Sequence, residues 1–97
     1  MNRAGATAAD EAMAIEVLGF LAEDPDRLAQ FVALAGIDLA DLRSAAAQPG
    51  FLAGVMEFLM QDDSLVIAFA SHANRRPESV AAAARRMGVG AWERDIP

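Results

Sequence analysis

The stretch FLAEDPDRLAQF, residues 20–31, decides how this chain of 97 residues folds, because it has an echo in FLMQDDSLVIAF, residues 58–69. In both, Phe-Leu leads into acidic residues, and an apolar segment then ends on Phe. The offset of 38 continues without a gap and pairs Gly36 with Asn74. Gly and Asn most readily adopt the left-handed conformation that ends a helix. We therefore interpret the echo as part of a tandem repeat.

The repeated unit is predicted to contain three helices and to occupy residues 12–46 and again 50–84. Apolar residues recur at three- and four-residue steps along the chain, and no stretch alternates as a strand does. We expect an all-α fold, a compact orthogonal array of five to six short helices in two pseudo-repeated halves. Start and stop signals place these helices near residues 8–23, 25–35, 39–47, 50–61, 63–73 and 77–87.

Each copy of the repeat has an elbow, the acidic segment between Phe-Leu and the next helix. The acidic pair in each elbow is explained by the helix start that follows it. Asp24 and Asp62 stand where an N-cap is needed, and Pro25 follows where its missing N–H costs nothing. Asp26 and Asp63 add negative charge at the positive end of the helix dipole. A Mg²⁺ or Ca²⁺ site is the weaker interpretation, because the spacing matches no EF-hand loop.

Two more helix starts are expected from acidic residues. Thr7 with Asp10, and Asp38 with Asp41, have the spacing of a capping box or a close variant of one. In this motif two side chains satisfy backbone N–H groups reciprocally. We expect these pairs to begin the first and the third helix.

The composition indicates a single domain, residues 1–97, and excludes several kinds of chemistry. Cys is absent and His72 is the only His, which excludes thiolate chemistry and a multi-histidine metal centre. No phosphate loop or pairing of a nucleophile with a base is present. We expect no enzymatic activity, no cofactor and no bound metal. The termini, residues 1–7 and 90–97, are expected to be flexible.

The charge is acidic overall but unevenly distributed. The formal net charge is −6, which argues against general affinity for nucleic acid or anionic membranes. Residues 75–97 nevertheless carry five Arg against three acids. No apolar run approaches the length of a membrane span or forms a signal-peptide core. We therefore expect a cytoplasmic protein.

The helices expected at 8–23 and 50–61 are apolar over nearly twice the width that a surface helix needs. In addition, the second copy has the apolar residues Leu65 and Ile67 where the first copy has Arg27 and Ala29. Something should cover these flanks, and the alternatives are Trp92 and Ile96 of the C-terminal segment, a partner protein or a second subunit. The candidate partner surface consists of Ile15, Leu18, Met56, Met60, Leu65 and Ile67.

The basic segment RRPESVAAAARRMGVG, residues 75–90, is similar to the first helix and turn of a helix-turn-helix unit. Only AWERDIP follows, which is too short for a recognition helix. The favoured interpretation is a helix that starts at Pro77 and ends at Gly88, with basic residues in its last turn. The candidate polyanion contacts are Arg75, Arg76, Arg85 and Arg86.

Three runs carry a family resemblance: FLAEDPDRLAQFVALAGIDLADLRSAA, FLAGVMEFLMQDDSLVIAF and the closing WERDIP. Over about residues 10–97 the chain resembles DUF3572, an alphaproteobacterial family of unknown function. The resemblance implies a single-domain bacterial protein of this size, with no assigned activity, ligand or site residue.

The function we expect is that of a small, non-catalytic helical protein-interaction module, which binds a partner protein or pairs with itself as a homodimer. The alternative is a weak nucleic-acid-binding regulator that uses the Arg-rich helix within residues 75–90. Membrane binding is not expected.

Overall fold

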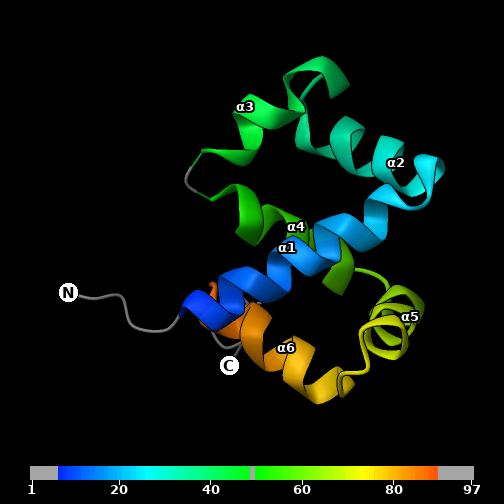
Figure 1. The fold of residues 1–97 in the computed structure, drawn as a ribbon, viewed down its shortest axis with the longest axis vertical. Helices are drawn as coiled ribbons and strands as arrows, with labels where there is room; N and C mark the ends of the chain where they lie inside the picture. The colour runs from blue at the N-terminus through cyan, green and yellow to red at the C-terminus, as the bar shows by residue number, and fades with distance from the viewer. Residues whose placement is uncertain (1–6, 49, 90–97) are drawn as a thin grey trace, which may run out of the picture.

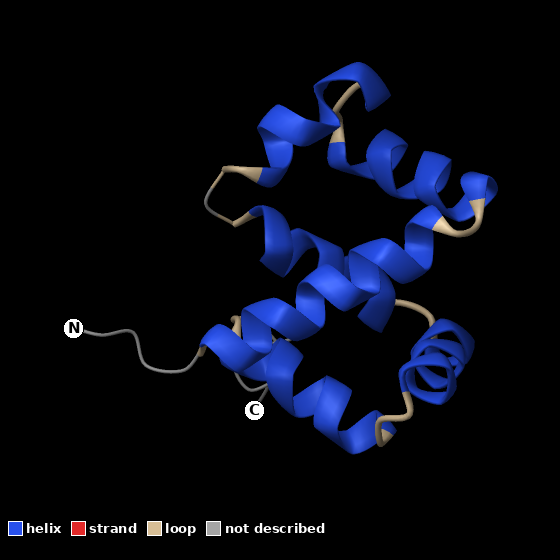
Figure 2. Cartoon of the chain, in the orientation of Figure 1, coloured by secondary structure: helices blue, strands red, loops and turns tan. Residues whose placement is uncertain are grey.

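Two helices, α1 (Ala8–Ala22) and α4 (Phe51–Met60), cross at the centre of the fold (Figure 1). The computed structural model describes residues 7–48 and 50–89, and every regular element within them is helical (Figure 2). The all-α expectation is thereby confirmed. The remaining elements are α2 (Pro25–Ala35), the 3-10 turn η1 (Leu39–Asp41), α3 (Leu42–Ala46), α5 (Asp63–Ala73) and α6 (Pro77–Arg86).

The helix starts and stops follow local chemistry, and most of them agree with the expected signals. The side chain of Asp24 accepts a hydrogen bond from the N–H of Asp26, and Asp62 caps α5 in the same way. Gly36 ends α2 and Asn74 ends α5, both in the left-handed conformation with φ of 74° and 57°. Both elbows are therefore helix joints, as the sequence predicts.

Of the two capping boxes that the sequence predicts, one forms and the other does not. Thr7 and Asp10 form the expected box at the start of α1, with N···O distances of 3.0 and 3.1 Å. Asp38 and Asp41 make no side-chain cap, so that prediction is wrong. The third helix, expected over residues 39–47, is instead divided into a 3-10 turn and a helix of five residues. Without a cap that satisfies its first N–H groups, the segment lacks one source of helix stability.

The core is centred on α1 and α4, as expected from their wide apolar faces. Val17 and Leu21 of α1 and Val55 and Leu59 of α4 are completely buried. In Figure 1, α2 and α3 lie on one side of this central pair, and α5 and α6 lie on the other. The fold therefore has two peripheral groups of helices that share one core.

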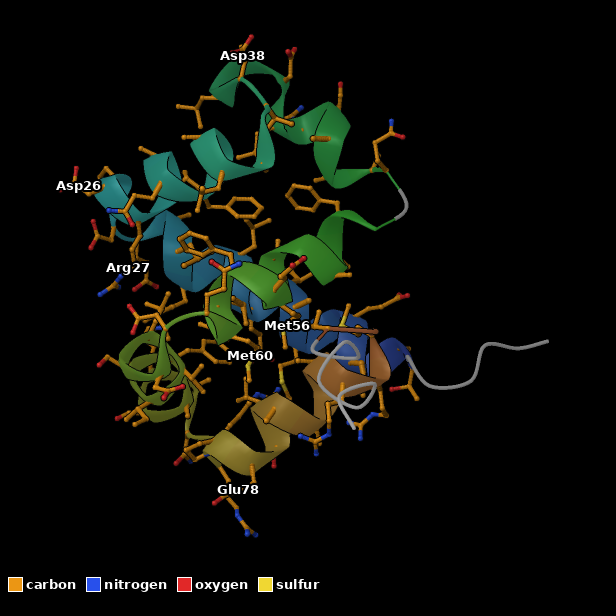
Figure 3. The ribbon with its side chains drawn as sticks, turned by 180° about the vertical axis from the view of Figure 1, so that it is seen from behind. Asp26, Arg27, Asp38, Met56, Met60 and Glu78 are labelled. Carbon is orange, nitrogen blue, oxygen red and sulfur yellow. The ribbon has the colours of Figure 1, made fainter. Side chains whose placement is uncertain are left out.

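Two residues predicted to lie on a partner surface are instead part of this core. Met56 is 0% exposed and Leu65 is 7% exposed. These side chains are buried by long-range packing. Helix α6 packs against α1, α4 and α5, so it covers a flank of α4 that contact with α1 alone would leave open. Figure 3 shows Met56 and Met60 near the middle of the molecule, toward α6. Trp92 and Ile96 lie outside the described residues.

The central packing predicts a large cost for Leu59→Ala. The change leaves a cavity where α1 meets α4, and we expect the free energy of unfolding to fall by about 2–5 kcal/mol in chemical denaturation. Leu39→Ala is the matched control, because Leu39 is 61% exposed, and it should change stability by less than about 0.5 kcal/mol. Equal losses in the two variants would contradict the central position of α4.

Candidate functional site

A groove of about 530 Å³ opens between α2, α3 and α4. Its floor is aromatic: the ring of Phe31 from α2 meets Phe51 and Phe58 from α4 edge to face, at centroid distances of 5.7 and 5.6 Å. Such pairs are favourable because the positive edge of one ring meets the negative face of another. Figure 3 shows aromatic side chains in the space between α2 and α4.

The rim of the groove combines apolar side chains with a few polar groups. Leu34 is 72% exposed, and Ile37 lies just beyond the end of α2. Gly54 lines the groove from within α4, and a methyl group added there would meet no atom within 4 Å. The polar groups of the lining are Glu57 and the amides of Gln48 and Gln61. The site is thus an apolar recess with a single carboxylate.

The groove is open because α3 is too short to cover the faces of α2 and α4. Leu42 and Ala45 of α3 are only half-buried, and Ala46 is exposed. By contrast, α6 has ten residues and buries Val80 and Ala83 on the other side of the molecule. The difference in length between these two helices explains why the larger opening lies on the side of α3.

A smaller cavity of about 260 Å³ lies between α1 and α5. Its floor is the pair Phe20 and Phe69, whose centroids are 5.6 Å apart in an edge-to-face arrangement. Charged groups border it. Arg75 donates two hydrogen bonds to Glu16, of 3.0 and 2.8 Å. His72, which the sequence placed near the end of a helix, is exposed and lies 3.6 Å from the carboxylate of Glu23.

The four Arg side chains predicted as polyanion contacts differ in their partners and in their exposure. Arg75 is paired with Glu16, and Arg86 donates two bonds of 2.8 Å to the buried carboxylate of Asp10. Arg76 and Arg85 are exposed, and Arg76 lies 3.9 Å from Glu78. Half of the basic set therefore fastens α6 and the turn before it to α1, which leaves two Arg side chains facing solvent.

Both bidentate pairs lower the pKa of the carboxyl group. The hydrogen bonds from Arg86 are the main cause for Asp10, and together with the backbone of Thr7 they outweigh burial, so its pKa falls from 3.8 to about 2. The same effect of Arg75 lowers the pKa of Glu16 below its usual value. Both acids are therefore ionised at neutral pH. The ion pairs that join α1 to α6 and to the turn before α6 persist at that pH.

The predicted partner surface is dispersed in the structure. Ile15 on α1 is 57% exposed and Ile67 on α5 is 60% exposed, whereas Leu18 and Met60 pack partly against the core. The groove contains none of the six predicted residues. The sequence gives only a weak indication of the groove. Gly54 lies on the polar face of its helix, but nothing local indicates that three Phe rings meet beside it.

Neither a metal centre nor a membrane span is found in the part of the chain that the structure describes. Across residues 7–48 and 50–89, no three His, Asp or Glu side chains are placed to hold a metal ion together. Within the same residues, every helix is too short or too polar to traverse a bilayer.

Comparison with known protein families matches residues 7–90 to DUF3572, described as a protein of unknown function. The chain belongs to this family. Comparison with curated proteins and with solved structures gave no match. The DUF3572 description assigns no activity, so a function has to be argued from the groove and its surroundings.

The pair between Asp10 and Arg86 predicts a pH-dependent loss of stability. The pKa of Asp10 is lower in the folded chain than in the unfolded one, so the pair stabilises the protein above about pH 4 and loses its effect as the pH falls toward about 2. Asp10→Asn should lower the free energy of unfolding at pH 7 by about 1–2 kcal/mol, measured by urea denaturation. The deficit should shrink below pH 4.

Glu11→Gln is the control for this prediction, because Glu11 is an exposed acid in the same first turn of α1. Its removal tests the general effect of negative charge at a helix start. A deficit in Asp10→Asn that is no larger than that of Glu11→Gln, or one that is unchanged at pH 3, would show that the ion pair does not stabilise the fold.

Proposed function

We propose that the chain is a small, non-catalytic protein-interaction module that binds a segment of a partner protein in the groove between α2, α3 and α4. The observation that carries the proposal is the exposed apolar lining of this groove. Leu34 is exposed at its border, and Ile37 and the rings of Phe51 and Phe58 are half-buried in its lining, with the buried Phe31 beneath them. Its volume falls in the range of about 300–1,000 Å³ that is typical of binding pockets.

The small size of the chain supports binding at the groove. A chain of 97 residues has little apolar surface to spare. Concave, mostly apolar recesses are where proteins most often bind ligands and partners. The exposed Ile15 and Ile67 are single side chains on separate helices, and scattered exposure of this kind needs no partner. The groove is therefore favoured over the flanks of α1 and α5.

The other functional classes fit the groove less well. Catalysis by proton transfer needs an acid and a base close together, and the lining offers one carboxylate, Glu57, with two amides. Nucleic-acid binding by the C-terminal Arg set is weakened because Arg75 and Arg86 are committed to Glu16 and Asp10. Self-association through the groove is an alternative that the experiments below separate from binding of a different protein.

Site-specific photocrosslinking in cells tests the proposal. A photoreactive amino acid at Leu34 should capture a defined partner, because this side chain lies exposed at the groove. The same group at Ile15 or Ile67 serves as the matched control on other exposed apolar positions. The captured protein is identified by mass spectrometry, and its binding is repeated with purified components. Capture from Ile15 or Ile67 alone would contradict the proposal and return the partner surface to those flanks.

Filling the groove should abolish capture without loss of stability. Gly54→Leu adds a side chain at the groove, where a Cβ meets no atom within 4 Å. Replacing a helical Gly also raises the free energy of unfolding by roughly 0.5–1 kcal/mol. Gly19→Leu is the control, because Gly19 is likewise within a helix and its Cβ position is equally free. Unchanged capture in a stable Gly54→Leu variant would refute the groove as the site.

A further inference from the structure

The groove and the smaller cavity are lined by corresponding residues. Each of the seven residues that line the smaller cavity has its counterpart, 38 positions away, among the residues that line the groove. The offset is the one that relates the two elbows in the sequence. The correspondence therefore extends from the sequence to the three-dimensional surroundings of the two cavities.

The aromatic floors correspond in geometry as well. Phe20 and Phe69 in the smaller cavity match Phe58 and Phe31 in the groove, again at an offset of 38. Both pairs have a centroid distance of 5.6 Å, with interplanar angles of 64° and 72°. The smaller cavity lies between α1 and α5, and the groove lies between α4 and α2. Each cavity thus joins the first helix of one half to the second helix of the other half.

The two cavities differ in the groups that border their floors. Glu16, which lines the smaller cavity, and its ion-pair partner Arg75 correspond to Gly54 and Ile37 in the groove. The contact between Glu23 and His72 corresponds to Gln61 and Leu34. The ion pair of Glu16 with Arg75 and the contact of Glu23 with His72 are therefore both replaced by neutral residues in the groove, which is about twice as large.

We infer that the groove, the larger copy of a duplicated site, is the copy that binds, and that its occupant is a partner helix that presents an Arg or Lys beside large apolar side chains. The chemistry of the occupant follows from the carboxylate that the groove offers beside the half-buried rings of Phe51 and Phe58. In the groove the carboxylate is Glu57. It lies one turn after Gly54 on α4 and forms no ion pair within the described residues.

The charge around the groove agrees with a cationic occupant. Residues 24–62 hold six acids against Arg27 and Arg43, which gives a net charge of −4. An acidic surface favours encounter with a basic partner and disfavours an acidic one. An amphipathic helix that lays its apolar face into a groove is a recurrent mode of recognition between helical proteins. This inference rests on the proposed function and adds the chemical class of the partner.

The test uses two synthetic peptides with full-length protein and fluorescence polarisation. Both are helix-forming peptides of about 14 residues with Leu on one face; one carries Arg residues beside the Leu positions and the other carries Glu. The Arg peptide should bind at least about tenfold more tightly than the Glu peptide. Glu57→Gln should reduce that preference several-fold, whereas Glu11→Gln, which removes an exposed acid from α1, should not.

A second variant transfers the ion pair of the smaller cavity into the groove. Gly54→Glu with Ile37→Arg places the corresponding residues at both positions, and we expect peptide binding to fall below detection. Circular dichroism and urea denaturation establish that the variant is folded. The single Gly54→Leu change supplies an independent block if the double variant is unstable.

Each outcome has a distinct meaning. If Leu34 captures a partner in cells but the two peptides bind equally, or Glu57→Gln leaves the preference intact, the cationic occupant is wrong and the proposed function stands. If neither peptide binds and groove-filling variants leave capture unchanged, both fail. Two further results would overturn the inference: a dimer in light scattering that Gly54→Leu dissociates, or tighter binding of the peptide GAWERDIP, residues 90–97, than of the Arg peptide.

Discussion

The packing of α1 against α4 is the contact on which the rest of the structure depends. Val17 and Leu21 of α1 and Val55 and Leu59 of α4 are removed completely from solvent. Because both helices are apolar on most sides, each can accept neighbours on more than one flank. The other helices are arranged around this pair, with α2 and α3 on one side and α5 and α6 on the other (Figure 1). Both cavities form where a central helix meets one of these neighbours.

The two sides of this central pair are completed in different ways. On one side, α6 buries small and β-branched residues against the core, and the pair of Arg86 with the buried Asp10 fastens it to α1. On the other side, α3 has only five residues and no side-chain cap, and it leaves the rings of Phe51 and Phe58 half-buried at the groove. The proposed function places a partner on the side where apolar surface stays exposed, at the groove.

The sequence predicted those features whose cause is local. Asp24 and Asn74 act through hydrogen bonds and backbone conformations within one turn, so the residue type and its spacing are sufficient to place the helix ends. Burial was harder to predict, because Met56 and Leu65 are buried in the full array of helices. The groove was not predicted at all. It depends on long-range contacts among Phe rings and on the failure of α3 to extend, neither of which has a local signature.

We propose that the groove between α2 and α4 is the binding surface and that the corresponding cavity between α1 and α5 is not. NMR titration of the isotope-labelled chain with the Arg peptide measures this directly, because Gly54 and Gly19 report on the two cavities within one sample. The account predicts saturating shifts of the amide signals of Leu34, Gly54 and Glu57, with the signals of Gly19 and His72 unchanged. Saturating shifts confined to Gly19 and His72, or equal shifts in both cavities, would contradict it.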